Sequence, residues 1–284
     1  PPVHVPPPRG KKFFISNVNS FVGQSLVEEL RNDHIAQDEV SVHSFIGTTT
    51  DLENAPVPSG VSKIITKEKT RAFWNTILDS DVVIYDLMTA DYDEVDHVIK
   101  TFKTSDYEDE KILILISSVM TWVNTPQRVK KADEEGENED EPADTEPDEN
   151  DPDPEPEPLA EDAVPPPKVL NFWESDFHLR VPSPRFQHFK TLETLALSST
   201  KAKPKFRAYV LCAGIMYGNG ERVFYNHFKK AWLQAPPQLP YLGNGENWIP
   251  TIHVIDCSRL VKRIVDWRPN HFYIFAVDRS WKPT

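Results

Sequence analysis

The stretch KFFISNVNSFVGQSLVEEL, residues 12–30, decides the class of fold. A short apolar run at 12–16 leads into a polar turn, and a helix is predicted from residue 21 to residue 30. A strand, a tight turn and a helix in this order form the first unit of a parallel α/β sheet. The amino end of that helix is the natural phosphate-binding position in such folds. We therefore expect an α/β protein and examine residues 16–23 as its phosphate site.

The same alternation of strand and helix patterns continues along the chain. KILILIS at 111–117 is the strongest strand, and it is apolar on both faces, which is typical of a parallel strand with helices on either side. Further strands are predicted at 40–46, 61–66, 81–85, 206–213 and 271–277, and helices at 71–78, around 95–102, at 186–198 and at 224–233. Together these elements predict a doubly wound parallel sheet with a small C-terminal subdomain.

The charge of the chain is concentrated in one segment. The 284 residues include 31 Lys and Arg against 44 Asp and Glu, a formal charge of −13, and 17 of the acids lie within residues 132–163, which contain no Lys or Arg. The rest of the chain has 27 acids and 31 bases. Like-charge repulsion and frequent prolines leave such a stretch nothing to pack with. Residues 124–167 are therefore predicted to be a disordered insertion, and the proline-rich residues 1–10 an extended tail.

The predicted domain organisation follows from these limits. Residues 11–123 and 168–213 form the Rossmann-like domain, and residues 214–284 form a small region that resembles a substrate domain and completes the sheet. No apolar run is long enough to span a membrane, and the basic residues form no stripe for nucleic acid. The histidines have no metal-binding spacing, so no metal site is expected.

Two other sets of residues are given structural roles. Cys212 and Cys257 lie in apolar runs and are expected to be buried small side chains in a reducing compartment. Phe224, Phe228 and Trp232, each four residues apart, are predicted to pack in the core or against another subunit.

Six short motifs occur in a characteristic order along the chain: 16–23 (SNVNSFVG), 81–85 (DVVIY), 116–122 (ISSVMTW), 185–190 (RFQHFK), 213–220 (AGIMYGNG) and 252–256 (IHVID). This order resembles the extended short-chain dehydrogenases/reductases, the sugar-nucleotide epimerase and dehydratase type. The resemblance runs from about Phe13 to Val277 and implies a Rossmann-like, NAD(P)-binding fold.

The resemblance implies that Asn17, Ser20 and Gly23 occupy the three glycine positions of the cofactor-binding turn. Gly23 retains the glycine that serves helix–strand packing, and asparagine tolerates the left-handed backbone expected at residue 17. Ser20, however, places a side chain where the cofactor phosphates would lie. Leu87 and Met88 likewise stand where the family has small alanines. We therefore expect no cofactor, and NAD(P) bound at this turn is the alternative.

The catalytic positions of the family correspond to Ser118, Phe186 and Lys190. In the family a tyrosine, assisted by the lysine and by a serine or threonine, acts as the general acid/base for hydride transfer. Phe186 stands at the position of that tyrosine, and a phenyl ring has no proton to transfer. The three positions are therefore interpreted as remnants, and none is a competent catalytic residue.

A closer resemblance covers most of the folded chain. Residues 113–122 (LILISSVMTW), 206–218 (FRAYVLCAGIMYG), 228–242 (FKKAWLQAPPQLPYL) and 247–256 (NWIPTIHVID) are similar to the N-terminal domain of the adenylate kinase 7 family. The resemblance implies a cytoplasmic protein of the ciliary axoneme, with axonemal proteins and its own kinase domain as partners. The chain contains no GxxxxGK[ST] phosphate loop. Phosphoryl transfer between ATP and AMP would therefore belong to another part of a longer polypeptide.

Three functional hypotheses follow. The favoured one is a catalytically degenerate dinucleotide-fold module that serves as a scaffold or regulatory domain of a ciliary adenylate kinase. The second is an active NAD(P)-dependent reductase or epimerase with an unusual proton donor. The third is a sensor that binds NAD(P)H without turnover. Binding of a dinucleotide separates the first from the others, and hydride transfer separates the second from the third.

Overall fold

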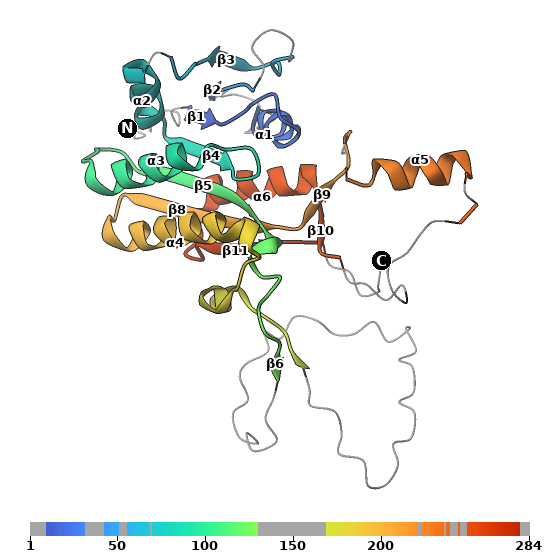
Figure 1. The fold of residues 1–284 in the computed structure, drawn as a ribbon. Helices are drawn as coiled ribbons and strands as arrows, with labels where there is room; N and C mark the ends of the chain where they lie inside the picture. The colour runs from blue at the N-terminus through green and yellow to red at the C-terminus, as the bar shows by residue number, and fades with distance from the viewer. Residues whose placement is uncertain are drawn as a thin grey trace, which may run out of the picture.

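The computed structural model describes residues 10–31, 43–50, 56–68, 70–129, 169–220, 223–235, 237–238, 244 and 249–278. Their centre is one seven-stranded sheet in the order β11-β8-β5-β4-β1-β2-β3, and every pairing in it is parallel (Figure 1). Its strands are β1 (Lys12–Ile15), β2 (Ser44–Gly47), β3 (Val61–Ile64), β4 (Val82–Asp86), β5 (Lys111–Ser118), β8 (Phe206–Ala213) and β11 (Tyr273–Ala276). The predicted doubly wound parallel sheet is confirmed.

The centre of the sheet is the pair β5 and β8, which run side by side over eight residues. Their register extends from Lys111 opposite Phe206 to Ser118 opposite Ala213. Every residue of β5 except Ser118 is buried. Because helices cover both faces of this strand, successive positions are apolar instead of alternating with polar ones.

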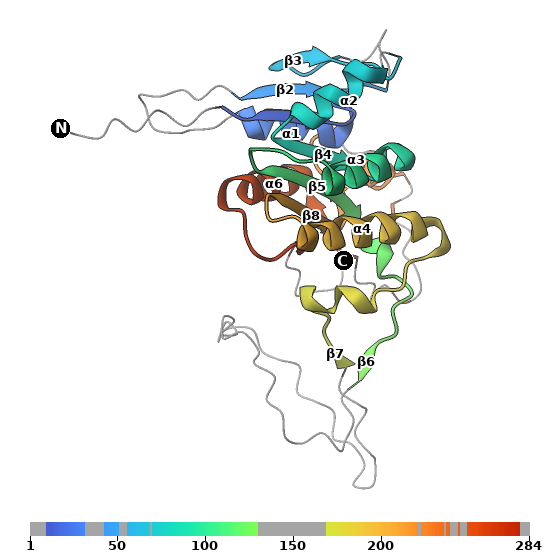
Figure 2. The same ribbon diagram turned by 90° about the vertical axis from the view of Figure 1, so that its left-hand side faces the viewer.

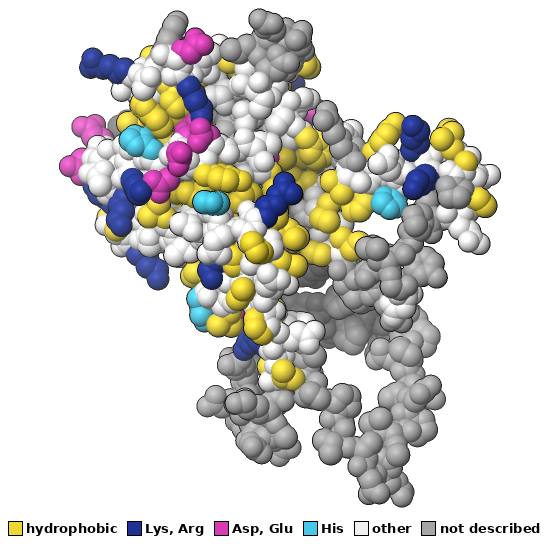
Figure 3. All heavy atoms as spheres, in the orientation of Figure 1, with side chains coloured by type: hydrophobic (Ala, Val, Ile, Leu, Met, Phe, Trp, Pro, Cys, Tyr) yellow, Lys and Arg dark blue, Asp and Glu magenta, His cyan; other side chains and the backbone are white. Residues whose placement is uncertain are grey.

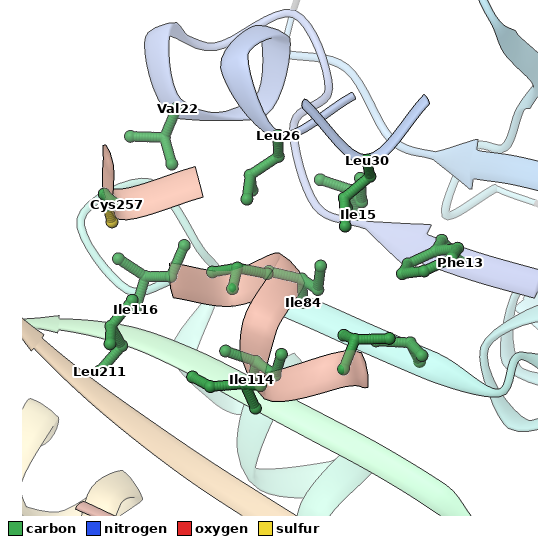
Figure 4. Close-up of a cluster of buried hydrophobic side chains, with 14 of the residues drawn as sticks. Phe13, Ile15, Val22, Leu26, Leu30, Ile84, Ile114, Ile116, Leu211 and Cys257 are labelled. Atoms are coloured by element: carbon green, nitrogen blue, oxygen red, sulfur yellow. The ribbon is translucent and has the colours of Figure 1, made fainter. Parts of the chain in front are cut away.

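Helices cover the two faces of the sheet. The helices are α1 (Phe21–Arg31), α2 (Thr70–Asp79), α3 (Tyr92–Thr104), α4 (Gln187–Ala202) and α6 (Val254–Trp267). On one face, Leu26 of α1 and Cys257 of α6 join the strand residues Ile84 and Ile114 in one apolar cluster (Figure 4). On the other face, α2, α3 and α4 lie together over the sheet (Figure 2). The helices predicted at 21–30, 71–78, 95–102 and 186–198 correspond to α1, α2, α3 and α4.

Helix α6 is an element that the predicted set of helices does not include. Its apolar side chains Val254, Cys257, Val261 and Ile264 recur at helical spacing and are buried, and the last three pack in the cluster with the sheet and α1. His253 begins the helix, because its Nδ1 accepts a hydrogen bond from the Ile255 amide at 3.3 Å. The motif IHVID is therefore the start of a core helix.

Short elements lie outside the sheet. β6 (Arg128–Val129) pairs antiparallel with β7 (Val169–Leu170), and β9 (Ile215–Tyr217) pairs in parallel with β10 (Thr251–His253). Three 3-10 helices are η1 (Val119–Thr121), η2 (Glu174–Leu179) and η3 (Pro184–Phe186). Figure 2 shows that β6 and β7 extend from the body at the end opposite β3.

Helix α5 (Tyr225–Leu233) projects away from the sheet (Figure 1) and buries none of its residues against the described part of the chain. Phe228 is 61% exposed and Trp232 is 88% exposed. The prediction that this aromatic stripe packs in the core is therefore wrong, because no apolar surface of the described residues lies against it. Contact with another subunit stays a prediction.

Several predictions concern residues outside the described ranges. These are residues 1–9 of the proline-rich tail, residues 40–42 of the strand predicted at 40–46, and residues 130–167 of the acidic insertion. The described part of that predicted strand corresponds to β2.

Gly23 lets the first helix approach the turn that precedes it. A Cβ atom on Gly23 would lie 2.8 Å from the Cα atom of Val18 and closer still to the carbonyl oxygen of Asn17. Both neighbours are backbone atoms, so no side-chain rotation relieves the overlap. The packing of α1 on this turn therefore requires a glycine.

We expect Gly23→Ala to destabilise the protein, although alanine is the better helix former by about 1 kcal/mol. The overlap should lower the free energy of unfolding by about 1–3 kcal/mol in urea denaturation. Glu28→Ala, at an exposed position of the same helix, is the control and should change it by less than about 0.5 kcal/mol. A Gly23→Ala variant more stable than the parent would contradict the close approach.

Candidate functional site

The order of the strands reverses between β1 and β4. From β1 the chain moves to one side through β2 and β3, and then returns to the other side with β4. In open parallel α/β sheets, ligands bind beyond the carboxyl ends of the strands at such a reversal. The predicted cofactor residues Asn17, Ser20 and Gly23 follow β1 at this point, and Asp86 ends β4. The carboxyl edge of the sheet at this reversal, where such folds have their crevice, is therefore the candidate site.

The amides of the turn after β1 are bound by the chain itself. The Asn17 amide donates to Thr48 Oγ1 and the Val18 amide donates to the Thr48 carbonyl oxygen, both at 2.9 Å. Asn17 adopts the left-handed conformation, with φ 52°, and its side-chain amide donates to the Thr89 carbonyl oxygen at 3.0 Å. Since Thr48 follows β2, the loop after the second strand holds the turn in place.

Ser20 caps the helix whose amino end would otherwise face a phosphate. Its Oγ accepts a hydrogen bond from the Gly23 amide at 3.0 Å. Because α1 begins at Phe21, Ser20 is the N-cap residue and Gly23 is the third residue of the helix. A dinucleotide would need free amides and close backbone approach at this point. Ser20 Oγ, Thr48 Oγ1 and the Thr48 carbonyl oxygen accept the hydrogen bonds of the Gly23, Asn17 and Val18 amides, so these three amides are not free for a pyrophosphate.

Two of the three predicted catalytic positions have structural partners of their own. Ser118 Oγ accepts a hydrogen bond from the Met120 amide at 3.3 Å and so caps η1. Lys190 Nζ donates to the Arg180 carbonyl oxygen at 2.8 Å. The serine and the lysine therefore both take part in hydrogen bonds of the local structure.

Phe186, the third position, is part of the apolar core. Its ring centroid lies 5.0 Å from that of Phe189, and the same cluster contains the fully buried Leu87. Met88, beside Leu87, is exposed. The space that small alanines would leave next to the crevice is thus occupied in part by the Leu87 side chain.

A buried ion pair that the sequence analysis missed lies beside these positions. Arg180 Nε donates to Glu193 Oε2 at 2.7 Å, and both residues are almost completely buried. The other carboxylate oxygen accepts a hydrogen bond from Ser117 Oγ, and Arg180 Nη2 donates to Thr194 Oγ1 at 3.0 Å. Burial raises the pKa of Glu193, and the Arg180 guanidinium acts in the opposite direction. The pair fastens the segment after η2 to α4.

A signal for this pair is present in the sequence. Glu193 stands beside Leu192 within the apolar pattern of the predicted helix at 186–198, at a position that α4 buries. A charge at a buried helical position needs a partner of opposite charge. The sequence did not identify Arg180 as that partner.

Asp86 is a second residue that the sequence analysis missed, although it follows the apolar strand DVVIY directly. Its carboxylate accepts hydrogen bonds from the Met88 amide at 3.0 Å and from Thr89 Oγ1 at 3.3 Å. Burial raises the pKa of Asp86 to about 6. At neutral pH the end of β4 therefore carries a buried negative charge, which disfavours a phosphate placed near it.

Metal and thiol chemistry have no support at this site. Among the residues described, no group of three or more His, Cys, Asp and Glu could hold a metal ion. Burial raises the pKa of the Cys212 and Cys257 thiols to about 12, so both stay protonated at neutral pH.

None of the helices in the described ranges combines the length and apolar character that crossing a bilayer requires.

Solved structures with the same fold identify the class. The chain matches dTDP-glucose 4,6-dehydratase from Bacillus anthracis in complex with NAD with a TM-score of 0.58 and 11% identity, over 95% of this chain and 76% of that one. It matches UDP-glucuronic acid 4-epimerase from Bacillus cereus in complex with UDP-glucuronic acid and NAD with a TM-score of 0.56 and 15% identity, over 95% and 78%. This chain has the Rossmann-type fold of NAD-dependent epimerases and dehydratases.

Sequence comparison narrows the relationship. The chain is 30% identical to adenylate kinase 7 of Mus musculus over 208 residues, and 40% identical to adenylate kinase 7 of Macaca fascicularis over 88 residues. These matches cover 72% and 31% of this chain, but only 28% and 16% of the two relatives. No protein-family model matches. The chain is homologous to a part of adenylate kinase 7.

We expect Arg180→Met to lower the free energy of unfolding by about 3–5 kcal/mol, because it leaves the Glu193 carboxylate buried without its positive partner. The double variant Arg180→Met/Glu193→Met should lose less than Arg180→Met alone, since it removes the uncompensated charge. A double-mutant cycle in urea measures both effects. Losses that simply add would show that the two side chains are not coupled.

We expect the Asp86 carboxyl to make the protein less stable as pH rises. Burial places its folded-state pKa at about 6, above the ordinary value of about 3.9, so the folded state binds the proton more tightly. Its contribution to stability is fully present below about pH 4 and is lost by about pH 6, a change of up to about 3 kcal/mol.

Asp86→Asn tests this assignment, because the amide can still accept the hydrogen bond from Met88. The variant should gain stability over the parent between pH 4 and pH 6.5 in urea denaturation. Asp109→Asn, at an exposed loop position, is the control and should follow the parent. Parallel pH profiles for Asp86→Asn and the parent would contradict the assignment.

Proposed function

We propose that this chain is a catalytically degenerate dinucleotide-fold module that acts as a scaffold or regulatory domain within an adenylate kinase. The phosphoryl transfer from ATP to AMP would be carried out by a part of the protein outside these residues. This proposal joins the homology to adenylate kinase 7 with a turn after β1 whose Asn17, Val18 and Gly23 amides are hydrogen-bonded by the chain itself.

The turn after β1 is the observation that carries the proposal. Ser20 Oγ takes the Gly23 amide, and Thr48 takes the amides of Asn17 and Val18. A dinucleotide that binds through these amides would first have to break those hydrogen bonds. Replacing them costs about 1 kcal/mol each when the partner is neutral.

The absence of a proton donor at residue 186 supports the loss of catalysis. Phe186 lies in the apolar core against Phe189, and Lys190 is bound to the Arg180 carbonyl oxygen. A hydride-transfer mechanism that uses a tyrosine as general acid/base cannot operate with a phenyl ring at that position.

The proposed location is cytoplasmic, in the axoneme of the cilium. The proposed partners are axonemal proteins and an attached kinase domain. It rests on the sequence resemblance to the adenylate kinase 7 family. A module that binds no small molecule would contribute through its surface, which fits attachment to large assemblies.

A sensor of NAD(P)H is the second candidate. The solved structures of the same fold contain NAD, and Gly23 keeps the close packing of helix on turn. In this role the turn amides would release their hydrogen bonds to Ser20 and Thr48. They would then bind the reduced dinucleotide, which would stay chemically unchanged.

Calorimetric titration of the 284-residue chain with NADH, NADPH, ATP and AMP tests the proposal. We expect no saturable heat up to about 1 mM of any of the four, which corresponds to binding weaker than about −4 kcal/mol. Phe186→Tyr should gain no reductase activity, because the dinucleotide is not held. Micromolar binding of a reduced dinucleotide would contradict the scaffold role and favour the sensor.

Ser20→Asp is the matched control for any binding that is observed. Aspartate keeps the helix cap and adds a negative charge where a phosphate would lie, so binding at the turn should be lost while stability is retained. Binding that survives in Ser20→Asp would lie elsewhere on the protein and would contradict the sensor as well.

A further inference from the structure

Helix α5 presents a physical problem that the proposed function does not solve. It has nine residues, Tyr225–Leu233, and none of them is buried against the described part of the chain. Isolated helices shorter than about 12 residues are marginal in water, and amphipathic helices in proteins are stabilised mainly by packing of their apolar face. A helix of this length therefore calls for a surface that covers it.

The apolar residues of α5 form one continuous face. Tyr225, Phe228 and Trp232 are spaced at i, i+3 and i+7, so they lie along one side of the helix. All three are exposed, and Leu233 extends the same face at its carboxyl end. This spacing is that of the anchor residues with which a helix binds in an apolar groove of another protein.

The charges on α5 are all of one sign. Lys229 and Lys230 follow Phe228, and the helix contains no Asp or Glu. The Lys229 ammonium lies 5.9 Å from the centre of the Tyr225 ring, at the border of the apolar face. Figure 3 shows lysine and apolar side chains together on this projecting helix. A complementary partner thus has an apolar floor and a rim of carboxylates.

A second copy of the chain does not meet this requirement at α5. Pairing two such helices would bring like-charged lysines to the edges of one small contact. The charge of this helix therefore favours a different protein as the occupant.

An anionic membrane is also a poorer fit than a groove. Two lysines contribute only about 1 kcal/mol each at such a surface. A groove encloses the helix on several sides, whereas a membrane covers only one.

We propose that α5 is a docking helix for an EF-hand protein, whose calcium-opened groove offers an apolar, methionine-rich floor and an acidic rim. Calcium binding to such proteins exposes this groove, and basic amphipathic helices are the segments it takes. The interaction is calcium-dependent and uses Phe228 and Trp232 as anchors.

Calcium-loaded calmodulin is the probe for this groove. We expect the 284-residue chain to bind it with Kd of about 10 μM or tighter in calorimetry, and to show no binding when EGTA replaces calcium. Trp232→Ala and Phe228→Ala should each weaken binding at least about tenfold, and Lys229→Glu/Lys230→Glu should weaken it further. Since α5 buries none of its residues against the described part of the chain, the thermal midpoint of each variant should match that of the parent.

Trp267→Ala is the matched control. Trp267 is 72% exposed, but it lies on α6 beneath the Arg263 guanidinium, 4.7 Å from the ring centre, and its loss should leave binding unchanged. No calcium-dependent binding at about 100 μM calmodulin, or equal binding by Trp232→Ala and the parent, would overturn the proposal. Sedimentation with phosphatidylcholine vesicles containing phosphatidylserine, lost in Trp232→Ala, would replace it with a membrane contact.

Discussion

The parallel pairing of β5 with β8 is the constraint on which the rest of the structure depends. Eight consecutive residues of each strand are in register, and both faces of a parallel sheet must be covered by helices because their connections cross over it. This requirement places α4, which connects β5 to β8 along the chain, on one face of the sheet. The other face is covered by α1 and α6. The Arg180–Glu193 pair fastens the segment just before α4 at the carboxyl edge of the sheet.

Folds of this class bind ligands at the same edge. Here other groups of the chain accept the hydrogen bonds of amides in the turn after β1. Ser20 and Thr48 take hydrogen bonds that a phosphate would otherwise receive. Leu87 and Phe186 fill the neighbouring volume with carbon, and Asp86 adds a buried carboxylate. The hydrogen bonds and the apolar side chains stabilise the protein without a ligand, and the carboxylate disfavours an anion. A fold that binds NAD in its structural neighbours is thereby compatible with a purely structural role.

Prediction from the sequence succeeded where one local pattern specifies one element. The run KILILIS could be recognised as a buried strand because its burial on both faces removes polar alternation. The prediction missed α6, where the apolar residues Val254, Cys257 and Val261 are separated by polar ones. It also placed the stripe of Phe228 and Trp232 in the core, since hydrophobic spacing shows that a face is apolar but not what covers it.

The sequence by itself determined the parallel α/β class, the glycine needed at residue 23 and a phenyl ring without a transferable proton at residue 186, because each depends on residue type at one position or in one short segment. Only the tertiary structure decided that Thr48 reaches the amide of Asn17, that Arg180 pairs with Glu193, and that the Glu174 carboxylate accepts the Phe275 amide at the sheet edge. These partners are separated by 31, 13 and 101 residues. Which of them meet depends on the order of the strands and on the path of the chain between them, and no local pattern of side chains carries that information.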